Sequence, residues 1–275
     1  MKSINCKGKL IDFSVPKVMG ILNLTPDSFY DGGLYQTHKL IVEKVEKMLV
    51  DGATFIDVGA YSSRPNAIHI SEDEELKRLI PILKLLVKTF PEILISVDTF
   101  RSKIAQESIE NGACMINDIS AGEMDETMFE TIAKLQVPYI LMHLKGTPQT
   151  MQINPTYENI LTELMFYFSE KMHQLRKLGV NDLIIDVGFG FGKTQNHNYQ
   201  LLQNFDYFLN LKVPILTGIS RKSMLYKPLN ATANEALNAT TVANTIALLK
   251  GTSILRVHDV KEAVEAVKIV ELLNN

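Results

Sequence analysis

Short apolar segments that end at, or just before, a polar residue recur eight times along the chain. They are brief and apolar at nearly every position, which is typical of parallel strands covered by helices on both sides. The pattern therefore predicts eight buried strands, at residues 18–22, 55–58, 94–97, 114–116, 139–142, 183–187, 214–216 and 254–257.

The segments between these runs carry helical spacing, with apolar residues three and four positions apart. One example is Ile41, Val45 and Met48. Three capping boxes indicate helix starts, namely Ser71 with Glu74, Thr127 with Glu130, and Thr232 with Glu235. Ahead of the first strand, residues 4–14 predict a small hairpin that turns at Lys7 and Gly8.

This alternation of strand and helix is compatible with a closed barrel or an open doubly wound sheet. Eight units in 275 residues favour closure, because a (β/α)8 barrel usually takes about 250 residues. We therefore expect an α/β protein of one domain, residues 1–275, folded as a (β/α)8 TIM barrel with a short N-terminal hairpin.

Composition narrows the range of partners. The chain is 46% hydrophobic with a formal net charge of −3, so it lacks the clustered basic charge that nucleic acids or anionic membranes require. The N-terminal residues lack the apolar core of a signal peptide, which predicts a cytoplasmic protein. Cys6 and Cys114 show no metal-ligand spacing and are expected to be reduced thiols, with Cys114 inside the fold. We expect a small-molecule ligand.

A parallel barrel brings the C-terminal ends of all its strands to one face. A single carboxylate there could simply cap a helix, but Asp57, Asp98 and Asp186 together imply a polar ligand, because burying unpaired carboxylates is costly. A flat heterocycle with adjacent N–H groups would suit these acceptors. The predicted set comprises Asn23, Asp57, Asp98, Asn117, His143, Asp186, Lys222, Arg256 and His258.

Arg256 and His258 flank Val257, so their side chains point the same way in a strand. A guanidinium beside an imidazole favours a phosphate or pyrophosphate. The alternative is a surface ion pair with Asp259.

A glycine-rich stretch, 188–194, follows the sixth predicted strand, but it lacks the spacing of a P-loop or of a dinucleotide-binding motif. We interpret it as a turn that lets the backbone approach a ligand while Phe189 or Phe191 forms an aromatic wall. Lys222 follows the seventh strand and is open to three roles: a Schiff-base lysine, a charge partner of Asp186, or a donor to a ligand.

Two segments, 25–37 and 61–70, are long for loops between strand and helix, which usually have about two to six residues. Such excess length is often functional. Asp31 could serve in turn chemistry or in a site, and Arg64 could clamp a substrate carboxylate.

Taken together, eight ordered motifs resemble the dihydropteroate synthase family of pterin-binding barrels, the targets of sulfonamide drugs. The resemblance runs from Met19 to Val260 through MGILNLTPDSFYDGG, FIDVGAYSSRP, ISVDTF, INDIS, MHLKGTPQTMQ, DVGFGFGKT, GISRKSM and RVHDV. It implies a homodimeric transferase that joins 4-aminobenzoate to 6-hydroxymethyl-7,8-dihydropterin pyrophosphate and releases pyrophosphate.

The resemblance also implies roles for individual residues. Asp98, Asn117, Asp186 and Lys222 would hold the pterin with support from Asp57, and Asn23 would meet pyrophosphate through Mg2+. The pyrophosphate would bind Asn23, Ser63, Arg256 and His258. The aminobenzoate would lie among Phe29, Ser63, Arg64, Pro65, Phe191 and Ser223, near Lys222. Asp98, Lys222, Asp31 and Arg256 would act in catalysis.

The chemistry implied by the family is dissociative: pyrophosphate leaves first, and the arylamine attacks the resulting pterin cation. Anions are then needed near the cation, and cations near the leaving group. Departures from the family pattern occur at Ala60-Tyr61, where Gly-Glu is common, and at Tyr30, Ser63 and Val187.

Three other interpretations remain open at this stage. A pterin-dependent methyltransferase barrel has a similar Asp and Asn pocket but needs no pyrophosphate subsite. A lysine aldolase would use Lys222 as Schiff base. A pterin-binding protein without turnover would keep the pocket alone.

Overall fold

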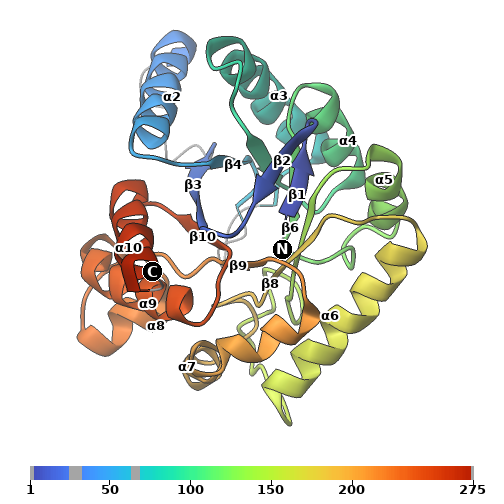
Figure 1. The fold of residues 1–275 in the computed structure, drawn as a ribbon. Helices are drawn as coiled ribbons and strands as arrows, with labels where there is room; N and C mark the ends of the chain where they lie inside the picture. The colour runs from blue at the N-terminus through green and yellow to red at the C-terminus, as the bar shows by residue number, and fades with distance from the viewer. Residues whose placement is uncertain (1–2, 25–32, 63–68, 274–275) are drawn as a thin grey trace.

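The computed structural model describes residues 3–24, 33–62 and 69–273. It contains a closed barrel of parallel strands in the order β10-β3-β4-β5-β6-β7-β8-β9, which confirms the predicted (β/α)8 architecture (Figure 1). The barrel strands are β3 (Lys17–Asn23), β4 (Phe55–Gly59), β5 (Ile95–Asp98), β6 (Met115–Asp118), β7 (Tyr139–Met142), β8 (Leu183–Asp186), β9 (Ile215–Thr217) and β10 (Ile254–Val257).

Helices surround the barrel on its outside (Figure 1). In the described part of the chain, none of them is both long enough and apolar enough to span a bilayer. The α-helices are α2 (Gly33–Val50), α3 (Glu72–Thr89), α4 (Ser102–Glu110), α5 (Met128–Leu135), α6 (Ile160–Lys177), α7 (Gln195–Gln203), α8 (Ser223–Tyr226), α9 (Leu237–Leu249) and α10 (Val260–Leu273). Short 3-10 helices are η2 (Phe205–Leu211), η3 (Lys227–Leu229) and η4 (Ala233–Glu235).

The predicted helix starts have mixed outcomes. Ser71 caps α3 by accepting a hydrogen bond from the backbone N–H of Glu74 at 3.2 Å, as expected. The box at Thr232 and Glu235 forms, but it begins the 3-10 helix η4. The box at Thr127 was wrong, because the Thr127 hydroxyl instead donates to the Asp125 carboxylate at 2.7 Å.

The first long loop is shorter than predicted, because α2 already begins at Gly33. The Pro, Asp and Gly residues that favour turns end at this position in the sequence. Residues 33–37, which the sequence placed in the loop, therefore belong to α2.

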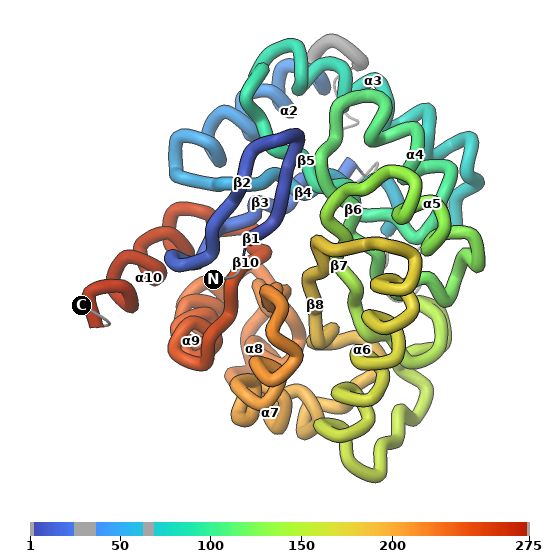
Figure 2. The backbone as a smooth tube through the Cα atoms, turned by 45° about the vertical axis from the view of Figure 1, so that its right-hand side comes forward, coloured from blue at the N-terminus to red at the C-terminus, as the bar shows by residue number. Residues whose placement is uncertain are grey.

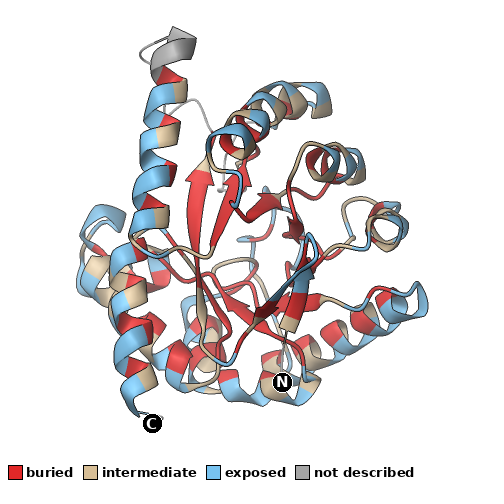
Figure 3. Cartoon of the chain, turned by 45° about the horizontal axis from the view of Figure 1, so that its top comes forward, coloured by how far each residue is buried: buried red, intermediate tan, exposed pale blue. Residues whose placement is uncertain are grey.

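Alternate residues of each barrel strand face opposite sides. In β4, Ile56 and Val58 pack with the residues of the surrounding helices, while Phe55 packs inside the barrel with Met19 and Ile140. Asp57 shares the inward side with Phe55 and is fully buried. The strands are accordingly buried along their length (Figure 3).

The predicted hairpin is confirmed as β1 (Ser3–Cys6) paired with β2 (Lys9–Asp12). Lys7 and Gly8 both have positive φ, 52° and 78°, as a tight hairpin turn requires. Figures 1 and 2 show the hairpin lying across one opening of the barrel. Ile4 and Cys6 pack there against the residues that begin the strands.

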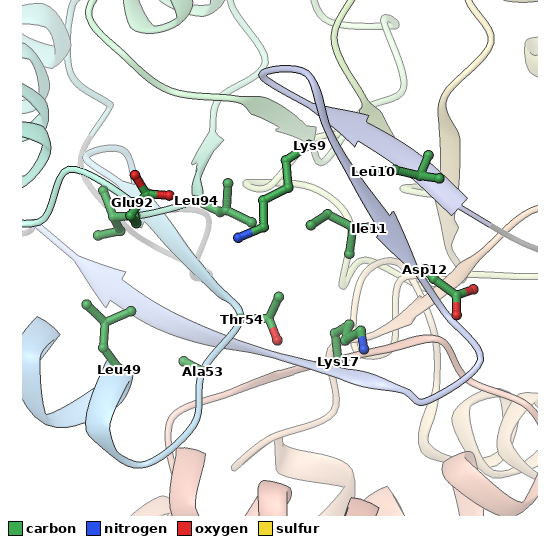
Figure 4. A pocket seen from close by; sticks show the side chains of 11 residues that line it. Lys9, Leu10, Ile11, Asp12, Lys17, Leu49, Ala53, Thr54, Glu92 and Leu94 are labelled. Carbon is green, nitrogen blue, oxygen red and sulfur yellow. The ribbon is translucent and has the colours of Figure 1, made fainter.

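This end of the barrel also carries a pocket of about 390 Å³ beside the hairpin, lined by residues such as Lys9, Lys17 and Glu92 (Figure 4). Cys6 and Cys114 are free and buried in the same region. The hairpin closes the end where the strands begin, so it leaves open the opposite end, where βα loops build sites in such barrels.

The buried contact between hairpin and barrel predicts a stability effect. Ile4→Ala should lower the free energy of unfolding by about 2–5 kcal/mol, because Ile4 is 1% exposed and truncation leaves a cavity. Leu10→Ala is the matched control, since Leu10 on the same hairpin is 71% exposed. Urea unfolding monitored by circular dichroism measures both, and equal midpoints would contradict the proposed packing.

Candidate active site

Neighbouring strands bring the predicted acidic residues together at the open end of the barrel. Asp98 at the end of β5 is in register with Gly59 on β4 and Asn117 on β6. The Asn117 amide donates to Oδ2 of Asp57 at 3.1 Å. Asp186 ends β8 on the same face. We call Asp57, Asp98, Asn117 and Asp186 the pocket floor.

Arg256 spans two of these carboxylates. Its Nε donates to Oδ2 of Asp57 at 2.6 Å and its Nη2 donates to Oδ2 of Asp98 at 2.7 Å. Although burial opposes its charge, the two carboxylates raise the pKa of the guanidinium. The sequence placed Arg256 on a diphosphate alone, whereas the structure shows it bound to the pocket floor. The Nη1 nitrogen has no partner among the described residues.

One oxygen of the pocket floor lacks a partner within the described part of the chain. Asp57 is 0% exposed, and its Oδ1 accepts no hydrogen bond there. An unpaired carboxylate oxygen in such a place is costly, so it usually indicates a ligand or a water.

Burial shifts the proton equilibria of the carboxyl groups. It raises the pKa of Asp98 to about 7, although the Arg256 guanidinium opposes the shift. Burial also raises the pKa of Asp186, against the pull of the Lys222 ammonium and a 2.8 Å hydrogen bond from the backbone N–H of Gly188. Asp98 and Asp186 are two acids of the pocket floor with raised pKa values, and such a pair indicates a functional site.

The glycine turn, residues 188–192, packs beside this floor. Gly188, Gly190 and Gly192 all have positive φ, as a turn of this kind requires. The structure distinguishes the two candidates for an aromatic wall. Phe189 is fully buried and stacks on Phe205, whereas Phe191 is only partly buried and is therefore the one that a ligand can reach.

Lys222 lies against this turn. Its ammonium donates to the backbone carbonyl of Phe189 and lies 4.3 Å from the centroid of the Phe191 ring. Burial lowers the pKa of Lys222 to about 8, with Asp186 opposing the shift. The lysine therefore donates to the turn and interacts electrostatically with Asp186, while its role toward a ligand stays a prediction.

His258 follows β10 at the exposed rim. Its Nδ1 lies 3.1 Å from the Ser220 hydroxyl, which also accepts from the His258 backbone N–H at 3.2 Å. Desolvation and the neighbouring Arg256 lower the pKa of this imidazole to about 4. The alternative pairing of Arg256 or His258 with Asp259 was wrong, because Asp259 binds Arg221 through two hydrogen bonds of 2.8 and 2.7 Å.

The remaining predicted residues divide into three groups. Asn23 ends β3, and Ser223 is exposed at the start of α8. His143 is 7% exposed; its backbone N–H donates to the Asp186 carbonyl at 3.1 Å, but its imidazole contacts Lys193. The other predictions fall outside the described residues, namely Phe29, Asp31, Ser63, Arg64 and Pro65.

Residues to which the sequence gave no role in the site make contacts with the loop after β5. Glu75, 0% exposed, accepts hydrogen bonds from Thr99 and Arg101 in the loop after β5. The Tyr61 ring packs edge-on against Phe100 at 5.0 Å. Their partners lie far away in sequence, so local pattern gave no signal for these contacts.

Comparison with known proteins identifies the class. A family model described as "Pterin binding enzyme" matches residues 19–258. The chain therefore belongs to the family of pterin-binding enzymes, within which its relatives are dihydropteroate synthases.

The similarity extends over nearly the whole chain. The dihydropteroate synthase of Haemophilus influenzae is 41% identical, covering 97% of each chain. The crystal structure of the Yersinia pestis dihydropteroate synthase with a sulfonamide drug has a TM-score of 0.92 at 40% identity, covering 99% of each chain. The Xanthomonas albilineans dihydropteroate synthase with 4-aminobenzoic acid has a TM-score of 0.92 at 33% identity, covering 99% of this chain and 98% of that one.

The buried position of Asp98 predicts its titration. In the free protein, Asp98 should titrate near pH 7, being protonated below that pH and charged above it. Removal of the guanidinium by Arg256→Met should move the titration to higher pH, because Arg256 favours the charged form. Carboxyl-carbon NMR with labelled aspartate measures both, with Asp98→Asn to assign the signal. If Asp98 titrates near pH 4 in the unmodified protein, the conclusion that burial raises its pKa is wrong.

Proposed function

We propose that this enzyme condenses 6-hydroxymethyl-7,8-dihydropterin pyrophosphate with 4-aminobenzoate, forming 7,8-dihydropteroate and releasing pyrophosphate. The observation that carries the proposal is the pocket floor, where buried carboxylates and one amide converge beside a guanidinium. The dihydropteroate synthase relatives support the same reaction.

The pterin would bind on the pocket floor. Its ring carries adjacent N–H groups, and the floor offers the acceptors that they need: Oδ1 of Asp57, which has no partner in the described part of the chain, and the carboxylates of Asp98 and Asp186. Asn117 and Lys222 would supply donors to the acceptor atoms of the ring. Pairing the ring with these groups offsets the desolvation that raises the pKa of Asp186.

The diphosphate would lie at the end of β10, against Arg256 and His258. The unpartnered Nη1 of Arg256 is available to a phosphoryl oxygen while Nε and Nη2 hold Asp57 and Asp98. An anion beside His258 would raise the pKa of the imidazole from about 4, so the proton would add charge where the leaving group collects it.

Magnesium is part of the proposal. Asn23 ends β3, the strand that pairs with β10, and its side chain offers a single amide oxygen. The described residues contain no group of three His, Cys, Asp or Glu that could hold a metal. Mg2+ commonly binds through few protein oxygens together with waters and substrate phosphates, so one Asn fits an ion that neutralises the bound diphosphate.

The aminobenzoate would approach from the rim, between Phe191 and Ser223, with Lys222 below. The family resemblance also implies that Phe29, Ser63, Arg64 and Pro65 line this subsite and that Asp31 acts in catalysis; these remain predictions. Sulfonamides would compete for the same subsite as analogues of 4-aminobenzoate.

The charges suit a dissociative substitution. As the carbon–oxygen bond to the diphosphate breaks, Arg256 and His258 hold the departing negative charge, and the ionised carboxylate of Asp98 stabilises the pterin methylene cation. The arylamine then attacks this carbon and loses a proton. An aromatic amine is unprotonated near neutral pH, so the step requires no strong base.

The other candidate functions receive less support. An aldolase would need Lys222 as nucleophile, but its ammonium is engaged with the Phe189 carbonyl and the Phe191 ring. A methyltransferase needs no diphosphate site such as the one proposed at Arg256 and His258. A pterin-binding protein without turnover is tested by the assay below. A cytoplasmic location stays a prediction.

The direct test is incubation of the protein with both substrates and Mg2+, with dihydropteroate and released pyrophosphate as readouts. Asp186→Asn should weaken pterin binding by about 1.5–3 kcal/mol in calorimetry, because it breaks a buried charged hydrogen bond. Asp206→Asn is the control, because Asp206 forms an ion pair with Lys250 at the surface; this variant should bind the pterin with unchanged affinity. Tight pterin binding without product would refute the enzymatic role.

We also propose that the protein is a homodimer that buries α9. Ala243 and Ala247 of this helix face the core, while three apolar residues on its outer side, Val242, Ile246 and Leu249, are 53%, 37% and 59% exposed. Exposed apolar residues gathered on one surface mark interaction sites, and homodimer interfaces are rich in apolar surface.

A charge on this face should separate the subunits. Ile246→Glu should yield monomers in analytical ultracentrifugation at micromolar concentration, because it buries an unpaired carboxylate in the interface. Phe166→Glu is the matched control, since Phe166 is 69% exposed on α6. If the unmodified protein sediments as a monomer, the dimer proposal is wrong.

A further inference from the structure

Lys193 is a buried cation that the proposed reaction leaves without a role. It follows the glycine turn, directly before the cap residue of α7, and is 3% exposed. Burial lowers the pKa of its ammonium, with the Asp186 carboxylate opposing the shift. Burying a lysine is costly, so its retention at this place calls for a specific set of partners.

Three acceptors surround the ammonium. Nζ lies 3.0 Å from Nδ1 of His143, 3.3 Å from the His143 carbonyl oxygen and 2.9 Å from the Phe191 carbonyl oxygen. A lysine ammonium has three donors, which matches this set. Burial also lowers the pKa of His143, so the imidazole is neutral and can accept through Nδ1. Lys193 thus links the loop after β7 to the glycine turn after β8.

The two segments fit closely where this link forms. A Cβ at Gly188 would lie 2.1 Å from the His143 carbonyl oxygen, and one at Gly192 would lie 2.8 Å from the Lys145 carbonyl oxygen. The backbones of the turn and the loop therefore touch directly. Without Lys193, the carbonyl groups of His143 and Phe191 would lose its ammonium as a donor at this close contact.

The glycine turn contacts two residues of the proposed aminobenzoate subsite, Phe191 and Lys222. The Phe191 backbone is held at both ends, since its N–H donates to Gly188 at 3.1 Å and its carbonyl accepts from Lys193. The Phe191 ring then lies 4.3 Å from the Lys222 ammonium, which donates to the Phe189 carbonyl of the same turn. A shift of the turn would displace the Phe191 ring directly, whereas Lys222 belongs to the segment after β9, where its backbone N–H donates to the Ile219 carbonyl at 3.2 Å.

We propose that Lys193 is a positioning residue for the reaction, which fixes the glycine turn so that the Phe191 ring is held in place to receive the aminobenzoate. This inference rests on the proposed function. Lys193 makes no hydrogen bond to the pocket floor, and Asp57 and Asp98 come from β4 and β5, which lie four and three strands away from β8 in the barrel. Its loss should therefore affect the second substrate more than the pterin.

The test compares Lys193→Met with the unmodified enzyme. We expect KM for 4-aminobenzoate to rise at least ten-fold and kcat to fall, while the Kd of the pterin changes by no more than about three-fold, a split that general destabilisation would not produce. Lys171→Met is the matched control, because Lys171 is a largely buried lysine that contacts Glu123 on the outside of the barrel. It should leave KM, kcat and the pterin Kd unchanged.

A second variant covers the case in which Lys193→Met does not fold. His143→Phe removes only the imidazole acceptor and leaves Lys193 its two carbonyl partners. It should raise KM for 4-aminobenzoate about three-fold in the same direction. Circular dichroism melting ensures that each variant is assayed while folded.

The outcomes separate the two proposals. An unmodified enzyme that forms no dihydropteroate would refute the proposed function. An active unmodified enzyme together with folded Lys193 and His143 variants of unchanged KM would refute the positioning role alone. An equal loss of pterin affinity and of aminobenzoate KM would also refute it, because the pocket floor would then depend on Lys193.

Discussion

The bridge from Arg256 to Asp57 and Asp98 is the interaction on which the open end of the barrel depends. Carboxylates cannot be buried close together without a counter-charge, because desolvation and mutual repulsion both oppose their ionisation. Arg256 supplies that charge through bonds of 2.6 and 2.7 Å. It also brings a guanidinium to the edge of the acid cluster, where a leaving group can meet it.

The Arg256 bridge compensates only part of the free-energy cost of burying these carboxylates. Oδ1 of Asp57 still lacks a partner among the described residues, and the pKa of Asp98 remains raised to about 7. The pocket is therefore held in an electrostatically unfavourable state that a ligand with N–H groups would relieve. This is how a binding site differs from a structural ion pair, in which the partners satisfy one another.

The two ends of the barrel have separate tasks. The hairpin packs apolar residues such as Ile4 against the strand starts and stabilises the fold. At the other end, polar contacts hold the loops around the pocket floor, including Arg101 with Glu75 of α3 and Lys193 with His143. Loop connections at that end can therefore vary between relatives while the barrel itself stays intact.

The sequence by itself determined the barrel and the identity of the pocket floor, because strand ends are local features and a closed parallel barrel leaves only one place for them to meet. Turn chemistry at Lys7 and Gly8 was also local and could be predicted. Only the tertiary structure decided the partners. Arg256 lies 199 positions from Asp57 and Lys193 lies 50 from His143, and no periodic pattern encodes such pairs. The sequence interpretation relied on neighbours along the chain when it assigned Arg256 to the diphosphate alone and offered an ion pair with Asp259 as the alternative. In the folded barrel, side chains pair with whatever partner lies within hydrogen-bonding distance.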